Sequence, residues 1–292
     1  MRMGIITRNE KGWCTTQLLH AMKKRSVSSF CFGFPQLVAH VGNPLRVAVD
    51  GKNLLKDADA LIMRPIGRGS LEEIIFRMDV LHRLERLGMI IVNPPLAIER
   101  AVDKFHTVAL LEENGISVPR TVATESAEEA LEAFFGLGGD VVVKPIFGSR
   151  GIGSTRISDA EVATRVFRAL AFNRMVLYVQ EFISHGFSDV RAFVVGDRVI
   201  AAMRRVADGW KTNVSLGAKP MTLRLDEGLE RLAVKASKVI GCKVAGVDIL
   251  ESEKGPLIVE LNSQPGWRGL QSVTEVNIAD EVVGFVLSEL RR

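Results

Sequence analysis

The sequence is short of cysteine and has no long apolar run. Three cysteines occur in 292 residues, and none of them forms the C-x-x-C pair that is typical of zinc and redox sites. This composition excludes a disulfide scaffold and fits a reducing compartment. No apolar stretch approaches the roughly 18–20 residues that a membrane helix needs, and the first residues lack the apolar core of a signal peptide. We therefore expect a cytoplasmic protein with no membrane segment.

A large excess of charge of one sign is also missing. The chain has 38 Lys and Arg against 34 Asp and Glu, a net charge of +4, and the basic residues are scattered. Nucleic-acid-binding proteins more often concentrate such residues on one helix or stripe, so we expect no nucleic acid partner. Apolar types make up 47% of the residues, which supplies a core without structural metal. The mild positive charge is better explained by a local site for a small anion.

The first third of the chain alternates between strand and helix patterns. Short apolar runs predict strands, and apolar residues at helical spacing predict helices between them. This alternation is typical of a parallel sheet flanked by helices, so we expect an α/β domain over residues 1–96. The predicted strands cover residues 3–7, 58–64 and 89–92, and the predicted helices cover residues 13–24 and 71–87.

The remaining residues have a different pattern, in which hairpins follow helices. Asp103 predicts the start of a helix that ends at Asn114-Gly115, and Gly196-Asp197 predicts a hairpin turn. We expect a second lobe over 97–184 and an α+β lobe over 185–292. Further strands are predicted at 119–123, 141–144, 176–183, 190–195, 198–203, 244–251 and 256–262, and further helices at 126–135, 229–240 and 278–290.

The last predicted hairpin carries the most informative polar residues. If its loop is symmetric about Lys254, Asp248 lies directly across from Glu260, and strand alternation puts Asn262 on the same face. Carboxylates opposed at about 5 Å repel each other unless a cation offsets their charge. All three side chains offer oxygen ligands of the kind that Mg²⁺ prefers, so the hairpin predicts a magnesium site; a solvated acidic face is the alternative. The opposite face is predicted to enter a core with Val247, Ile249, Val259 and Leu261.

A lysine followed by closely spaced glycines predicts a phosphate site. Lys144 ends a β-branched strand, and Gly148, Ser149, Gly151 and Gly153 follow it. Glycines let backbone N–H groups approach a phosphate, and the lysine adds a positive charge. The order G-x-x-G-x-G matches neither the dinucleotide fingerprint nor the Walker A loop, so a plain surface turn is the alternative.

Three other positions are unusual for their surroundings. Lys104 lies in the first turn of a helix, where the helix dipole disfavours a cation unless an anion binds there; an exposed, screened lysine is the alternative. Arg191 lies on an otherwise apolar strand face and needs an anion partner, unless it reaches water. The backbone at Glu181 and Phe182 could meet the edge of a planar base, although Phe182 could equally pack in a core.

In this order, the motifs resemble those of the RimK-like amino-acid ligases of the ATP-grasp superfamily. The resemblance runs from about residue 90 to the C-terminus, and the N-terminal domain agrees only in outline. Each motif alone is weak, but several in one fixed order are specific. The matching stretches are residues 103–104, 142–145 with 148–153, 179–183, 188–191, 211–213, 245–250 and 259–266.

The resemblance implies an ATP-grasp fold behind an N-terminal parallel α/β domain, and a carboxylate–amine ligase reaction. ATP would phosphorylate a carboxylate, and an amine would then displace the phosphate to form an amide. By position, Arg191 and Asn213 would face the transferred phosphoryl group as catalytic residues. The phosphates of ATP or GTP would be contacted by Lys104, Lys144, Lys211 and the glycine loop. The base would meet Glu181 and Phe182, and the ribose would meet Asp189. Two Mg²⁺ ions, for which Mn²⁺ could substitute, would be held by Asp248, Glu260 and Asn262.

The segment after Pro265-Gly266 narrows the resemblance. Trp267-Arg268 is similar to the branch that adds glutamate to coenzymes such as tetrahydromethanopterin, and both residues could contact an acceptor with rings and carboxylates. A Trp267 that fills the core is the alternative. Arg64 ends a strand where α/β domains place ligand contacts, so it could bind a substrate carboxylate or form a structural salt bridge. The expected substrates are glutamate and a carboxylate-bearing acceptor.

Other functions stay open from the residues alone. The acceptor could be a ribosomal protein, a deazaflavin coenzyme or an amino-group carrier protein, although the basic, glycine-rich stretch of many enzymes that modify ribosomal protein is missing after Asn213. A noncatalytic nucleotide-binding regulator is a further alternative, but it would be expected to lose some metal ligands, and all three are present. Relatives in this family are commonly dimers or tetramers, so we expect a homo-oligomer.

Overall fold

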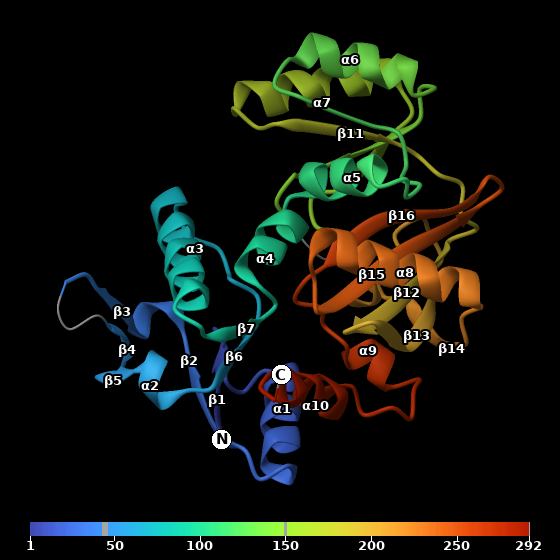
Figure 1. Ribbon diagram of the computed structural model, residues 1–292. Coiled ribbons are helices and arrows are strands. Elements are labelled where there is room, and N and C mark those ends of the chain that lie inside the picture. The colour runs from blue at the N-terminus through green and yellow to red at the C-terminus, as the bar shows by residue number, and fades with distance from the viewer. Residues whose placement is uncertain (43–45, 149–150, 292) are drawn as a thin grey trace.

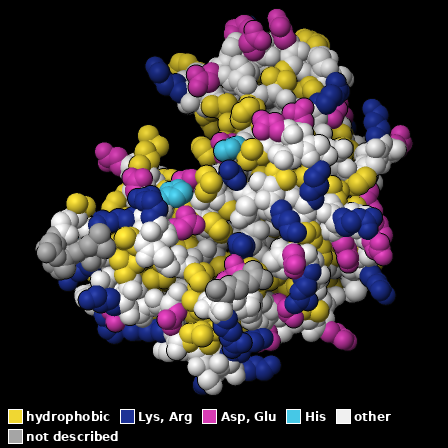
Figure 2. Space-filling model, in the orientation of Figure 1, with side chains coloured by type: hydrophobic (Ala, Val, Ile, Leu, Met, Phe, Trp, Pro, Cys, Tyr) yellow, Lys and Arg dark blue, Asp and Glu magenta, His cyan; other side chains and the backbone are white. Residues whose placement is uncertain are grey.

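The computed structural model describes residues 1–42, 46–148 and 151–291 (Figure 1). Three lobes are visible, and the N-terminal and C-terminal lobes lie side by side while the lobe between them in the sequence stands above the C-terminal lobe. None of the described helices is long and apolar enough to cross a membrane. On the face shown in Figure 2, basic and acidic side chains are interspersed without a stripe of one sign.

The N-terminal lobe is a parallel sheet with helices, as the alternating pattern predicts. Its strand order is β2-β1-β6-β7, and all three strand pairings are parallel. The pattern did not predict β2, because Ser28 and Ser29 interrupt its apolar residues. The sheet consists of β1 Arg2–Ile6, β2 Ser28–Phe32, β6 Ala60–Met63 and β7 Ile90–Val92, with α1 Trp13–Lys24 and α3 Leu71–Arg86. A smaller sheet contains β3 Leu37–His40, β4 Arg46–Val49 and β5 Lys52–Asn53, followed by α2 Leu54–Asp57.

The middle lobe is an antiparallel sheet covered by two helices, and we call residues 121–181 the lid. Its strand order is β10-β9-β11-β8, and α6 and α7 lie together above β11 in Figure 1. Phe134 and Phe167 are buried in a core that belongs to the lid alone. The lid elements are β8 Thr121–Thr124, α6 Ala127–Gly136, β9 Val141–Lys144, β10 Thr155–Ile157, α7 Ala160–Phe172 and β11 Leu177–Glu181.

The C-terminal lobe is a five-stranded antiparallel sheet in the order β14-β13-β12-β15-β16. Alternation along β12 gives the sheet two different faces. Val190 and Val194 pack under α8, whereas Phe193 and Val195 pack toward α10 and the N-terminal lobe. The elements are β12 Ser188–Val195, β13 Arg198–Val206, β14 Lys219–Leu223, α8 Glu227–Ile240, β15 Val244–Ser252, β16 Gly255–Asn262, α9 Arg268–Gln271 and α10 Ile278–Glu289.

The N-terminal and C-terminal lobes pack more closely against each other than either of them packs against the lid. One core contains Met3 and Ile5 of β1 together with Phe193 of β12, and α1 packs beside α10. Within the segment 97–184, α4 Pro95–Val102 and α5 Lys104–Glu113 pack against α8 and β16 of the C-terminal lobe. The lid sheet therefore stands apart and leaves a cleft above the C-terminal sheet.

A β-bulge decides the register of the carboxylate hairpin. The pairing of Asp248 with Glu260 is confirmed, but the loop is not symmetric about Lys254, because Ser252 pairs with Gly255. The register shifts by one residue next to Asp248, so Val259 is the extra residue of β16. Ile258 consequently occupies the core position predicted for Val259, and Val259 lines the cleft instead.

Candidate functional site

The cleft between the lid and the C-terminal sheet gathers most of the predicted nucleotide and metal residues, but none of the predicted substrate residues. β9, β11 and the glycine loop form its lid side, and β12, β13, β15 and β16 form its floor. The predicted residues that line it are Lys104, Lys144, Gly148, Gly151, Glu181, Phe182, Asp189, Lys211, Asn213, Asp248 and Glu260. Segments more than 140 residues apart in the sequence therefore meet here, as the order of motifs predicts.

Two lysines from different elements, Lys104 of α5 and Lys144 of β9, line the cleft, and the charge of Lys104 contributes to lowering the pKa of Lys144. Lys144 Nζ donates to Gln180 Oε1 at 2.6 Å. Burial lowers the pKa of Lys144 to about 8, although the charges of Glu260 and Asp248 oppose this shift. Lys104 Nζ donates to Gly148 O at 2.9 Å, and burial lowers its pKa as well. Two partly desolvated cations facing one cleft are suited to a polyanion such as a nucleotide phosphate chain.

The glycine loop approaches the opposite wall closely at Gly151. This residue has φ +69°, which favours glycine, and an added Cβ would also displace the Asn213 side chain. Gly153 has φ +80° and lies against Pro145 in the same loop, outside the cleft lining. Ser149 lies outside the described residues. The loop thus reaches from the lid to Asn213, which precedes a short 3₁₀ turn.

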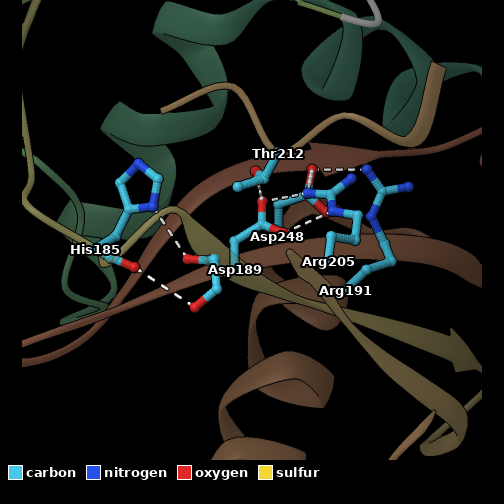
Figure 3. A network of polar contacts seen from close by, with 7 residues as sticks. His185, Asp189, Arg191, Arg205, Thr212 and Asp248 are labelled. Carbon is cyan, nitrogen blue, oxygen red and sulfur yellow. Dashed lines mark hydrogen bonds and ion pairs between the residues drawn. The ribbon is translucent and has the colours of Figure 1, made fainter. Parts of the chain in front are cut away.

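An ion-pair network lies at the floor of the cleft, and Arg191 joins it from behind the residues that line the cleft (Figure 3). Arg191 Nη2 donates to Asp248 Oδ2 at 2.6 Å, and its Nε donates to the other oxygen of that carboxylate. Arg205 Nη2 lies 3.0 Å from Asp248 Oδ2, and Arg205 Nε donates to Asp189 Oδ1 at 2.6 Å. Thr212 Oγ1 donates to Asp189 Oδ2 at 2.7 Å. Arg191 therefore has the anion partner that its apolar strand face predicts, and it does not turn to water.

Sequence reasoning missed Arg205, although it bridges two predicted site carboxylates. A regular hairpin with its turn at Gly196-Asp197 would pair Asp189 with Arg204. A bulge between Phe193 and Val194 shifts the register, so Arg205 lies opposite Asp189 instead. The sequence does show two adjacent arginines, Arg204 and Arg205, on the strand that pairs with the Ser188–Arg191 motif. Which of the two lies opposite Asp189 depends on the bulge.

The charged pair of carboxylates fits a hard cation. Burial raises the pKa of Asp248, but Arg191 and Arg205 outweigh this effect and hold it below its ordinary value. Glu260 lies opposite Asp248 and makes no hydrogen bond or ion pair with any described residue. Asn262 Nδ2 is buried and unpartnered. Two carboxylates and an amide oxygen beside several cations suit Mg²⁺ that also binds phosphates, and Asp248 is too buried for the solvated alternative.

The segment that joins the lid to the C-terminal lobe holds aromatic and charged groups at the cleft edge. The backbone amides of Glu181 and Phe182 donate to Arg120 O and Asp140 O, and the Glu181 carboxylate accepts two hydrogen bonds from Arg120. The Arg156 guanidinium lies 3.5 Å from the centroid of the Phe182 ring. The next residue, Ile183, lines the cleft as well. Trp210, which sequence reasoning also missed, lies beside Phe182, and Lys211 Nζ is 5.1 Å from its ring centroid.

The residues predicted to contact the substrate lie at the junction of the N-terminal and C-terminal lobes. Trp267 is 2% exposed and packs edge-on against Trp13 and Phe193, which agrees with the core-filling alternative. Arg64 is buried after β6, and its guanidinium carbon is 4.9 Å from the centroid of the Trp267 ring. It forms no salt bridge with a described residue. Arg268 is exposed at the start of α9.

Comparison with known proteins agrees with this geometry. The family model of the RimK-like ATP-grasp domain matches residues 101–286. The tetrahydromethanopterin:alpha-L-glutamate ligase of Methanocaldococcus jannaschii is 36% identical over 298 residues, which cover 100% of both chains. The protein of the same name from Methanococcus maripaludis is 34% identical over 293 residues, which cover 99% of this chain and 98% of the relative.

The fold is also similar to that of solved structures. ATP-grasp ligase PsnB complexed with minimal precursor has a TM-score of 0.78 at 20% identity, with 99% of this chain and 98% of the other covered. A RimK domain protein ATP-grasp from Sphaerobacter thermophilus has a TM-score of 0.76 at 20% identity, with 98% and 99% covered. At this level of identity the likeness concerns the fold alone, and it confirms the predicted ATP-grasp architecture.

Proposed function

The chain belongs to the RimK-like ATP-grasp family, and from that premise we propose that it is an ADP-forming ligase which joins L-glutamate to a carboxylate-bearing coenzyme. One observation carries the proposal: two tetrahydromethanopterin:alpha-L-glutamate ligases match the chain at 34–36% identity over nearly its whole length. The acceptor we favour is therefore tetrahydromethanopterin. The cleft supports an enzyme rather than a noncatalytic regulator, because all three proposed metal ligands and both arginines of the floor are present.

The proposed reaction has two steps. An oxygen of the acceptor carboxylate forms a bond to the γ-phosphorus of ATP, while the bond from that phosphorus to the bridging oxygen of ADP breaks. The glutamate amine then forms a bond to the acyl carbon, the phosphate leaves with the bonding electron pair, and the amine loses a proton. The products are an amide, ADP and phosphate.

The residues of the cleft divide this work between them. Lys104 and Lys144 hold the nucleotide phosphates, and Arg191 with Asn213 faces the transferred phosphoryl group. We assign the base to the segment after Glu181, the ribose to Asp189, and a further phosphate contact to Lys211. Cations placed where charge spreads over the transferring oxygens lower the barrier, because they need no reorganisation during the reaction. Because the base would meet backbone atoms, GTP is an alternative to ATP.

We assign the magnesium ligands to Asp248, Glu260 and Asn262. Bound Mg²⁺ would offset negative charge on the phosphate oxygens. We propose two ions, with Mn²⁺ as an effective substitute, because two carboxylates lie opposite each other and the phosphate chain supplies further oxygens. Metal titration with stoichiometry from isothermal calorimetry in the presence of ADP tests the number.

The proposal is tested by following ADP release together with acceptor mass. The protein is incubated with Mg²⁺, ATP, L-glutamate and one acceptor at a time: tetrahydromethanopterin, a deazaflavin coenzyme, a ribosomal protein or an amino-group carrier protein. We expect ADP and a gain of one or more glutamyl units on the pterin coenzyme. A gain only on another acceptor would overturn the acceptor and keep the ligase. Tight Mg·ATP binding without ADP release for any acceptor would favour a noncatalytic regulator.

We also expect a homodimer or homotetramer, on the resemblance to relatives alone. Light scattering of the purified protein with and without Mg·ADP measures the assembly. A monomer at working concentration would contradict the expected assembly. It would not contradict the proposed reaction, because the described cleft is built from one chain.

A further inference from the structure

Arg64 differs from the other buried arginines of the described residues. Arg77 and Arg205 are buried as well, but each is paired with a carboxylate, Glu73 and Asp189 respectively. Arg64 is 9% exposed, and no carboxylate lies within ion-pair distance of it. Its one recorded hydrogen bond is from Nη1 to Pro265 O, at 3.2 Å. A buried guanidinium without a counter-ion is costly, so a partner from outside the chain would stabilise it.

The loop that Arg64 contacts, between β16 and α9, holds other hydrogen-bond donors without partners. Gln264 Nε2 and Trp267 Nε1 are buried and make no hydrogen bond, and they flank the Pro265 carbonyl that Arg64 contacts. Each buried donor that lacks a partner lowers the stability of the folded state. All the unsatisfied groups here are donors and one is a cation, so the missing ligand must present acceptor oxygens and negative charge. A carboxylate meets both requirements.

This group of donors lies beside the reaction centre and outside the nucleotide cleft. A Cβ added at Gly246 would be 3.0 Å from Pro265 Cβ and 3.1 Å from Arg191 Nη1, so Pro265 and Arg191 lie against the same glycine. Arg191 in turn binds Asp248. None of Arg64, Gln264 and Trp267 lines the nucleotide cleft. Gly266, the next residue, faces open space, which leaves a side of the loop free for a ligand.

We propose that Arg64, with the Gln264 amide beside it, binds a substrate carboxylate that takes no part in bond formation. The inference rests on the proposed ligase function and adds a recognition site to it. The carboxylate comes either from the incoming glutamate, which keeps two of them, or from a second carboxyl group of the acceptor. In both cases the site fixes one end of the substrate while the reacting atoms lie near Arg191. Trp267 serves as the wall on which the guanidinium rests, and the exposed Arg268 is not part of the site.

The experiment compares Arg64→Gln and Arg64→Lys with a matched control, Arg68→Gln. Arg68 is an exposed arginine of the same loop, and its side chain makes no recorded ion pair. Steady-state ADP release is measured while ATP, glutamate and acceptor are varied in turn. For Arg64→Gln we expect the KM of one carboxylate substrate to rise about 30-fold or more, because a charge-assisted pair is lost. The KM for ATP stays within about twofold, and Arg64→Lys gives a smaller rise.

Glutamate analogues separate recognition from a loss of structure and identify the source. L-glutamine lacks the side-chain carboxylate, and glutamic acid α-amide lacks the other one. If glutamate is the ligand, the wild type discriminates against one analogue and Arg64→Gln loses this discrimination, so the ratio of kcat/KM values approaches one. If the acceptor supplies the carboxylate, Arg64→Gln leaves the ratio of kcat/KM values for glutamate and its analogue unchanged. Only the KM for the acceptor then rises.

The outcomes distinguish this inference from the proposed function. Unchanged KM values for both carboxylate substrates in Arg64→Gln would overturn the site and leave the ligase intact. An equal loss of kcat with all substrates, and no change in any KM or analogue ratio, would also overturn it in favour of a structural role. A wild type that releases no ADP with glutamate and any acceptor would overturn the proposed function. In that case the site is supported only if L-glutamate binds the Mg·ADP form in calorimetry and Arg64→Gln weakens it, and it is overturned otherwise.

Discussion

At the scale of single residues, the floor of the cleft is a charge-balanced cluster. Asp248 lies between Arg191 and Arg205, whereas Glu260 opposite it has no such partner. The two proposed metal ligands therefore differ in what their removal does. Glu260 can be neutralised without breaking an ion pair, but neutralising Asp248 leaves two arginines less well compensated.

Glu260→Gln is expected to reduce Mg²⁺-dependent ADP release by about a hundredfold or more, with little change in stability. Asp248→Asn is expected to lose the same activity and, in addition, to lower the free energy of unfolding by about 3 kcal/mol. Urea unfolding and ADP release are measured on both, with Glu253→Gln, in the exposed turn of the same hairpin, as the control. Full activity in Glu260→Gln would contradict the metal assignment.

We expect Lys144 to make nucleotide binding depend on pH. Its pKa is lowered to about 8, below the ordinary lysine value, so the folded protein releases this proton more easily than the unfolded chain does. Between the folded pKa and the higher pKa of the unfolded chain, the unfolded chain binds more protons at Lys144, so the contribution of Lys144 to the free energy of unfolding increases with pH. Phosphate binding has the opposite preference, because it needs the charged amine.

We expect the affinity for Mg·ADP to fall about tenfold between roughly pH 7.5 and 9.5, with proton uptake on binding near pH 8.5. Calorimetry in two buffers of different ionisation enthalpy measures the protons taken up. Lys144→Met should bind more weakly and lose most of this uptake, with a remainder from Lys104, whose pKa is also lowered. Identical proton uptake in Lys144→Met and wild type would contradict the role of Lys144.

At the scale of elements, one asparagine connects β7 to the strands that carry the proposed metal ligands. Asn93 is 1% exposed, and its Oδ1 accepts from Lys243 N at 2.7 Å and Val244 N at 2.8 Å. Its Nδ2 donates to Val244 O at 2.7 Å and to Ser263 O. The side chain thus holds the start of β15 against the residue that follows Asn262.

Asn93→Ala is expected to lower the free energy of unfolding by about 3–5 kcal/mol, because it leaves several buried backbone groups without partners. The control Asn173→Ala removes one exposed hydrogen bond, to Ala169 O, and should change it by less than about 0.5 kcal/mol. Urea titration of both variants measures the difference. Equal effects would mean that water or a neighbour replaces the Asn93 bonds.

At the scale of the whole molecule, the lid has a core of its own and meets the rest of the protein across the cleft. A nucleotide that contacts Lys144 on the lid and Asp248 below it would connect the two parts. Binding to the folded state alone raises stability with ligand concentration.

Mg·ADP at a hundredfold excess over its Kd is expected to add about 2.7 kcal/mol of stability, which corresponds to a rise in Tm of roughly 4–5 °C. Differential scanning fluorimetry measures the shift, with ADP and EDTA as the comparison without metal. Lys144→Met should show a much smaller shift at the same concentration. A full shift in the presence of EDTA would contradict joint binding of metal and nucleotide.

The sequence by itself determined the elements, the order of the motifs and the fold class. Capping residues such as Asp103 and turn residues such as Gly196-Asp197 act over a few neighbours, so their effect can be predicted from local pattern. The family resemblance added the expectation that Asp248 and Glu260 hold Mg²⁺, which stays a prediction. Helix α7 was not predicted, although its apolar residues recur at helical spacing, whereas strand β2 has apolar residues at only three of its five positions.

The pairing of Asp248 with Glu260 could be predicted from the sequence, but only the tertiary structure decided the other side-chain pairings of the site. Both hairpins carry a bulge, and each bulge shifts the pairing by one residue, which brings Arg205 opposite Asp189 and turns Val259 toward the cleft. A bulge forms where packing on both faces of a sheet favours it, and such packing involves α8, α10 and the N-terminal lobe. That Arg64 is buried without a counter-ion likewise follows only from the tertiary structure, because its burial depends on segments that are distant in the chain.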